Sequence, residues 1–240
     1  MAAAPPAQLW HQVTDFLGLS GHQPSRGLVL ASALVALAAV ASRRLWPVTR
    51  TVVTIAHEGG HALAALLTGR RLNSVRVLRS TAGVTVSSGS RSGPGIVLTT
   101  AAGYTAPPLL GLGAAALVAT GHLASMLLIS IAGLAGLAIV VRNVFGILAV
   151  LVTGAAIGLV MWRGSPLAEA AAGYALTWFL LLGGVRPVLE LQGTRRRRPG
   201  GSTDADQLAE LTGLPGWFWV GVFGLIALAA VAVSAWWLIR

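Results

Sequence analysis

The residues of this 240-residue chain best suited to chemistry lie in one short stretch, His57-Glu58-Gly59-Gly60-His61. If the stretch is helical, His57 and His61 lie one turn apart on one face, where both imidazoles can bind a single metal ion. Glu58 lies close by and could take a proton from a water molecule at that ion. The two glycines remove side chains beside the ion and would leave room for a substrate backbone. This spacing predicts zinc-assisted peptide hydrolysis.

The residues around this motif are apolar, which sharpens the prediction. Apart from His57, Glu58 and His61, nearly all residues from Thr51 to Leu67 are Ala, Val, Ile, Leu, Thr or Gly. Ionisable side chains at membrane depth are costly, and a shared metal ion gives three of them a common reason to be there. The alternatives are a polar helix face without a ligand and a metal-free remnant of such a site. We expect the motif to lie on a transmembrane helix.

The composition is typical of a polytopic membrane protein. Hydrophobic residues make up 55% of the chain and charged residues 10%, with a mean hydropathy of +0.76. The absence of cysteine excludes disulfides and thiolate ligands, which leaves imidazole and carboxylate as metal ligands. The net charge of +10 comes from arginines that separate apolar segments. We therefore assign these arginines to membrane orientation and lipid headgroups, and expect no nucleic acid partner.

Apolar segments divide the chain into a polar leader, residues 1–26, and a single membrane domain, residues 27–240. The expected transmembrane helices, about seven, cover residues 27–46, 48–68, 95–119, 123–141, 144–162, 167–185 and 217–239. Alternating β-branched residues after the second helix predict a short β-hairpin. The Arg/Gly-rich segment 193–201 is expected to be a disordered loop, and residues 202–211 to begin another helix. The predicted fold class is all-α and polytopic, with this hairpin following the motif helix.

Arginine placement predicts the orientation of the chain. With the amino terminus in the cytoplasm and seven spans, most arginines fall on the cytoplasmic side. His61 then lies nine residues before Arg70, about 14 Å deep at 1.5 Å per residue. The site would thus be nearer the cytoplasmic side. The use of arginine without lysine, with much alanine and glycine, suggests a bacterial plasma membrane as the location.

The two histidines leave a catalytic zinc site one protein ligand short, since three are usual. Of the few acidic residues, Asp15 lies in the leader, Glu169 on the outer side, and Glu190 among arginines that are expected to pair with it. Asp204 and Asp206 begin the segment that leads into the last span, on the same side of the membrane as the motif. Either could instead cap that helix. We take Asp204 as the third ligand and Asp206 as the alternative.

Several stretches together resemble the site-2 protease family of intramembrane zinc metalloproteases, in its small bacterial metalloprotease B-like branch. These are Ala56-His57-Glu58-Gly59-Gly60-His61-Ala62, the predicted hairpin, Gly103-Tyr104 and Thr203-Asp204-Ala205. The resemblance covers about residues 48–220 and implies that His57, His61 and Asp204 bind Zn²⁺ while Glu58 activates water. It also implies a membrane protein or peptide as substrate. The chain lacks the Asn-Pro-x-x-Pro-x-x-Asp-Gly-type segment and the PDZ-like domain of better-known members.

Other classes of protein could carry the same motif. A transporter or scaffold could bind a metal ion or protons through these side chains without hydrolysis, although no inverted repeat between the halves favours a transporter. A lipid-acting hydrolase would need the same residues. The protease is our main hypothesis.

Overall fold

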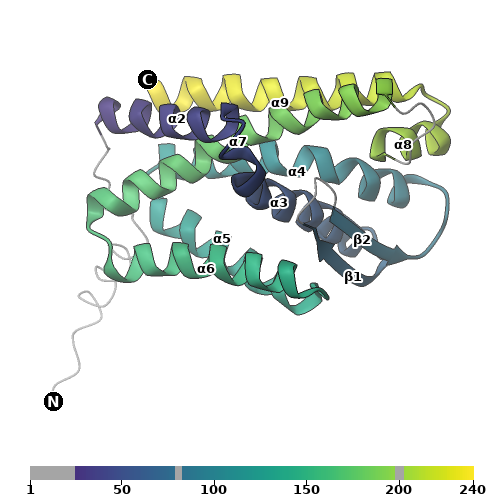
Figure 1. The fold of residues 1–240 in the computed structure, drawn as a ribbon, viewed down its shortest axis with the longest axis horizontal. Helices are drawn as coiled ribbons and strands as arrows, with labels where there is room; N and C mark the ends of the chain where they lie inside the picture. The colour runs from purple at the N-terminus through teal and green to yellow at the C-terminus, as the bar shows by residue number, and fades with distance from the viewer. Residues whose placement is uncertain (1–24, 79–82, 198–202) are drawn as a thin grey trace, which may run out of the picture.

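The computed structural model describes residues 25–78, 83–197 and 203–240, so the leader expected at 1–26 lies almost wholly outside the described residues. The helices and strands of the described part, in chain order, are α2 (Arg26–Ala41), α3 (Trp46–Leu67), β1 (Arg71–Val77), β2 (Gly83–Ser88), α4 (Pro94–Ala119), α5 (Leu123–Val140), α6 (Val144–Arg163), α7 (Pro166–Arg197), α8 (Asp204–Thr212) and α9 (Gly216–Ile239) (Figure 1). The all-helical architecture and the hairpin after the motif helix are confirmed.

The number of candidate membrane spans is five or six rather than about seven. By length and composition α4, α5, α6, α7 and α9 can each cross a membrane, whereas α2 and α3 pass only as a pair bent by 103°. The chain turns sharply between these two helices, so the two predicted spans together supply at most one crossing. The protein is thus an integral multi-pass membrane protein.

Both ends of the described chain lie at the same end of the bundle (Figure 1). The Arg26 guanidinium donates a hydrogen bond to the main-chain oxygen of Arg240 at 2.7 Å. The hairpin and α8 lie at the opposite end. Within the described residues, Arg26 and Arg240 therefore lie at one end of the bundle and the motif helix leads into the hairpin at the other.

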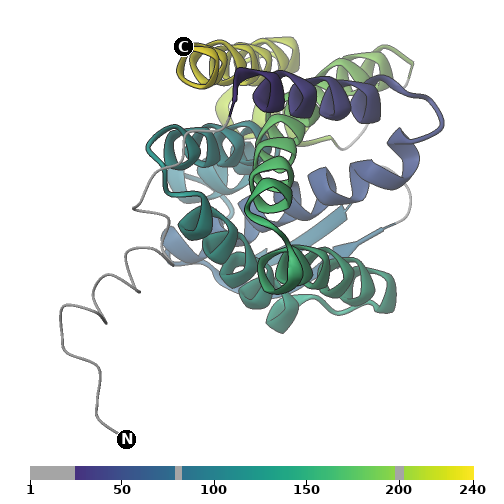
Figure 2. The ribbon, with the colours of Figure 1, turned by 90° about the vertical axis from the view of Figure 1, so that its left-hand side faces the viewer.

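The helix α4 forms the centre of the bundle and contacts α3, α7, α8 and α9. Figure 2 shows α2 and α9 together along one side and α5 and α6 on the other. Close packing depends on glycines, because a Cβ at Gly184 would lie 2.7 Å from the Pro108 ring and one at Gly111 would lie 2.8 Å from the Leu181 side chain. The helix α4 continues through Pro107 and Pro108 without a break.

The hairpin pairs β1 with β2 in antiparallel register, from Arg71 opposite Ser88 to Val77 opposite Gly83. The outer edge of β1 is covered by the connection between α5 and α6. There the Asn143 amide accepts a hydrogen bond from the Val77 nitrogen at 3.1 Å and donates one to the Val77 oxygen at 2.7 Å. Asn143 therefore covers the outer edge of β1, and both strands contact the motif helix α3.

The helix α7 extends further than expected, to Arg197, so residues 193–197 are helical and only 198–201 of the predicted loop lie outside the described residues. Arg195 donates a hydrogen bond to Asp206 at 2.7 Å. This ion pair joins the end of α7 to the start of α8. Because Arg195 and Asp206 belong to different helices, the composition of residues 193–201 alone did not reveal this pair and suggested a disordered loop.

Candidate metal centre

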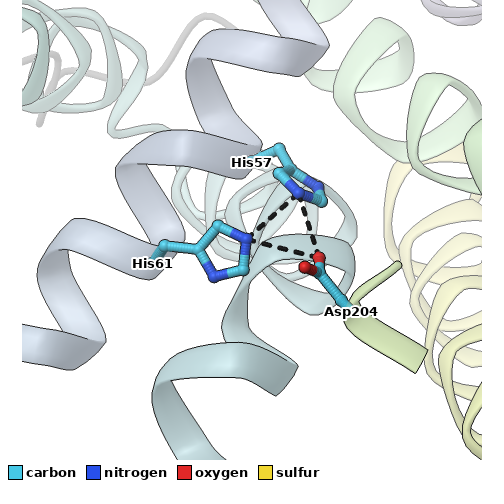
Figure 3. Close-up of side chains that lie close together, drawn as sticks. All are labelled: His57, His61 and Asp204. Carbon is cyan, nitrogen blue, oxygen red and sulfur yellow. Dashed lines mark hydrogen bonds and ion pairs between the residues drawn. The ribbon is translucent and has the colours of Figure 1, made fainter. Parts of the chain in front are cut away.

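Three side chains predicted as metal ligands converge at one point (Figure 3). His57 and His61 come from successive turns of α3, and Asp204 is the first residue of α8. The two imidazole Nε2 atoms lie 3.1 Å apart, and each lies 3.3 Å from Asp204 Oδ2. The structure therefore brings together residues separated by more than 140 positions in the chain.

The triangle formed by these three atoms fits a tetrahedral zinc ion. Bonds of about 2.0–2.1 Å in tetrahedral geometry place ligand atoms about 3.3 Å apart. In addition, Asp204 Oδ2 is a buried oxygen without a hydrogen-bond partner among the described residues. A buried carboxylate oxygen in that position is costly unless a cation meets it. The donor set of two imidazoles and one carboxylate is one that catalytic zinc accepts, with one position left open.

Main-chain contacts from α4 orient the two histidines. His61 Nδ1 lies 2.7 Å from the Thr99 carbonyl oxygen, which can only accept, so Nδ1 carries the proton and Nε2 is free to bind an ion. A Cβ at Gly103 would overlap His61 Nε2 and lie 2.6 Å from His57 Nε2. Only glycine allows α4 to pass this close to the site. The Tyr104 ring packs edge-on against His57, with ring centroids 4.8 Å apart.

Asp204 is positioned by the way in which α8 begins. Thr203 caps the helix and exchanges hydrogen bonds with Asp206 in a capping box. Burial raises the pKa of Asp206, but hydrogen bonds from Thr203 and Arg195 outweigh it and hold this pKa below its ordinary value. The apolar side of α8 buries Leu208 completely in a cluster with Phe223 of α9. Asp206 therefore serves the cap, and Asp204 is the carboxylate that reaches the histidines.

Glu58 is held beside the site by the hairpin. Its side chain is 2% exposed, and Oε2 accepts a hydrogen bond from the Thr85 hydroxyl at 2.6 Å. Gly83, the first residue of β2, has no side chain, and a Cβ there would overlap the Glu58 carboxylate. The hairpin thus sets the position of Glu58, which is buried next to the histidines and does not join their triangle.

The motif glycines do not open space for a substrate as expected. A Cβ at Gly60 would overlap Ala106 of α4, so this glycine allows two helices to approach. A Cβ at Gly59 would meet Leu137 of α5 at 3.9 Å. Gly60 therefore serves helix packing, and Gly59 faces α5 and does not line the cavity beside the histidines.

A cavity of about 290 Å³, lined by both charged and apolar residues, opens beside the triangle. Its lining includes His57, Glu58 and Asp204 at one end and Trp46, Arg50 and Glu190 at the other. As expected, Glu190 is charge-paired: its Oε1 accepts a hydrogen bond from Arg186 Nε at 2.9 Å. The open position of a tetrahedral ion and a general base would therefore share one water-accessible space.

Sequence reasoning missed three contributors to this site: the Thr99 carbonyl, the Thr85 hydroxyl and Arg50. Arg50 lies seven residues before His57, which is two helical turns, so its position on the same face of α3 was available as a signal. The other two depend on how α4 and the hairpin pack against α3. No local pattern encodes that packing.

Comparison with known proteins gives one match. The family described as Peptidase M50B-like matches residues 30–234. No curated protein and no solved structure matches the chain.

Proposed function

Because the chain belongs to the Peptidase M50B-like family, we propose that it is an intramembrane zinc metalloprotease that hydrolyses peptide bonds of membrane proteins or peptides. The observation that carries this proposal is the triangle of His57 Nε2, His61 Nε2 and Asp204 Oδ2, with edges of 3.1–3.3 Å, beside a cavity that His57 and Asp204 line. These three residues would hold the ion. Bound there, zinc would polarise a scissile carbonyl and lower the pKa of a water molecule to about 7.

The role of Glu58 is proton transfer. The Thr85 hydroxyl engages Oε2, so Oε1 is the oxygen available to accept a proton from the attacking water. The same carboxyl group then gives that proton to the nitrogen of the leaving amine. Burial by the hairpin keeps this group in one position between the two transfers.

An extended substrate would best fit beside β2. The peptide bonds of a transmembrane helix are internally hydrogen-bonded, so the helix must unwind before it can be cleaved. The outer edge of β1 is occupied by Val141–Asn143 in the described structure. This supports β2, which carries Gly83 and Thr85 against Glu58, as the strand along which an unwound segment would pair.

The positions of the arginines support a site on the cytoplasmic side of a bacterial plasma membrane. The carboxyl ends of α3 and α7 lie near the hairpin and α8 (Figure 1). Arg70 and Arg71 follow the end of α3, and Arg195–Arg197 form the last residues of α7. Such clusters are retained in the cytoplasm. The chain has no native cysteine, so single cysteines introduced at Arg71 and Arg163 would report their sides by labelling with an impermeant maleimide.

The proposed function is tested by Glu58→Gln in the full chain, reconstituted in lipid nanodiscs. We expect about one zinc per chain by mass spectrometry, as in the wild type. Cleavage of a panel of fluorogenic transmembrane peptides should fall about 100- to 10,000-fold, which is the contribution of a general acid–base group. Glu210→Gln, an exposed acid on α8, is the matched control and should cleave normally.

Each other outcome contradicts a different part of the proposal. Cleavage that survives Glu58→Gln removes Glu58 from the mechanism. Wild-type protein that binds zinc and cleaves no peptide would instead favour a transporter or scaffold. A wild type without zinc affinity would contradict the metal centre itself.

A further inference from the structure

The cavity beside the metal centre has a second charged end that the proposed chemistry does not use. Arg50 of α3 lines it, on the same face as His57 and two turns before it. Its side chain is only 16% exposed. A largely buried guanidinium is expensive unless its five N–H donors find acceptors.

Arg50 is poorly satisfied by the protein. Its closest carboxylate contact is Nη2 to Glu190 Oε2 at 3.8 Å, and its guanidinium lies 5.8 Å from the centre of the Trp46 ring. Within the described ranges of the chain, no hydrogen bond of this guanidinium is recorded. Arg50 therefore keeps its donors for a group that enters the cavity.

Glu190 is already neutralised by other partners. Its Oε1 accepts hydrogen bonds from Arg186 Nε and from Trp46 Nε1, both at 2.9 Å. Arg186 also donates to the Val40 carbonyl and stacks on Trp46 at 4.7 Å from the ring centre, so it joins α7 to α2 and α3. Arg186 and Arg50 thus share one carboxylate, Glu190, and Arg50 is the more distant of the two. The positive charge that Glu190 does not balance is therefore that of Arg50.

Tyr104 adds a neutral donor to the same space. Its ring is fixed between His57 and Phe223, with which it stacks at 5.1 Å. The residue lines the cavity, and among the described residues its hydroxyl makes no recorded hydrogen bond. A fixed ring with a free hydroxyl can donate to an acceptor held by Arg50 at little entropic cost.

We propose that Arg50, assisted by the Tyr104 hydroxyl, is a carboxylate-binding subsite for the substrate. The inference rests on the proposed protease function and names a substrate class for it. Seven helical residues span about 10 Å, which an extended peptide covers in about three residues. The substrate would thus carry a carboxylate, from an acidic side chain or from its own carboxyl terminus, about three residues from the scissile bond.

The test uses peptide hydroxamates, which bind zinc through the hydroxamate, and the zinc-loaded full chain in nanodiscs. Three probes are identical except at their carboxyl-terminal residue, which lies three residues from the hydroxamate. This residue is Gln with an amidated terminus, Glu with an amidated terminus, or Gln with a free carboxyl terminus. Calorimetry should show at least one carboxylate probe binding about 10- to 100-fold more tightly than the amidated Gln probe, as expected for a hydrogen-bonded charge. The arm that gains affinity identifies the source of the carboxylate.

Variants separate the subsite from general charge. Arg50→Gln should abolish the preference with zinc content unchanged, and Arg50→Lys should retain part of it because the charge remains and the fork is lost. Arg43→Gln removes one exposed arginine between α2 and α3 and should keep the full preference. Equal binding of all three probes, or a preference that survives Arg50→Gln in folded protein, would overturn the subsite and leave the protease proposal standing. Failure of every probe to bind would overturn both.

Discussion

The two halves of the metal centre are built in different ways. The α3 half sets the spacing of His57 and His61 through helix periodicity, inside a 22-residue helix packed against α4. The α8 half places Asp204 at the first residue of a nine-residue helix, which depends on a cap, an ion pair and two buried apolar residues. One half is set by local sequence and the other by contacts between distant segments. The first should tolerate surface changes, and the second should respond to them.

The largest effect should come from filling the space at Gly103 of α4, which lies against the two histidines of the α3 half. In Gly103→Ala the new methyl group meets Nε2 of both histidines at once. Zinc affinity should fall by more than the roughly 100-fold that loss of one outer-shell partner can cost. Gly113→Ala is the matched control, because it lies on the same helix and its Cβ would meet nothing within 4 Å. Isothermal titration with zinc compares the two variants, and normal affinity in Gly103→Ala would show that α4 does not border the ion.

An intermediate effect is expected in the α8 half. Asp206→Asn keeps the shape of the side chain but weakens the pairing with Arg195 and the reciprocal cap with Thr203. Zinc affinity should fall about 10-fold, the lower end for an outer-shell change. The exposed Glu210→Gln on the same helix should bind zinc normally. If Asp206→Asn instead abolishes binding, Asp206 and not Asp204 would be the ligand, and the contrast between the two halves would need revision.

The smallest effect should be at the hairpin, which packs against α3 but contributes no side chain to the His57–His61–Asp204 triangle. Thr85→Val removes the hydroxyl that donates to Glu58 at 2.6 Å and keeps the β-branched shape. The cleavage rate should fall about 2- to 10-fold, as for loss of one ordinary hydrogen bond. Zinc content should stay constant, and Thr85→Ser should restore the rate. A parallel loss of zinc in Thr85→Val would mean that the hairpin supports the metal centre as a whole.

The same contrast explains what the sequence could predict. The spacing of His57 and His61 carries its own geometry, and the scarcity of acids in a chain without cysteine reduced the third ligand to Asp204 or Asp206. From the sequence, either aspartate could cap the helix. In the structure Asp206 forms the capping box with Thr203, which leaves Asp204 as the candidate ligand. The expected number of spans was too high by one at the bend between α2 and α3, because hydropathy reports the length of an apolar segment and not the direction in which the chain runs. Arg195 was assigned to a loop because its partner lies on another helix.

The shared position of Arg26 and Arg240, at the end of the bundle away from the hairpin, has a practical consequence. A reporter fused after Arg240 would lie at the end of the bundle away from the hairpin and α8. In sealed vesicles, an antibody or fluorophore could then be delivered to one aqueous face while chelators are added to the other. Tethering the protein to a surface through that fusion would leave the hairpin pointing into free solution.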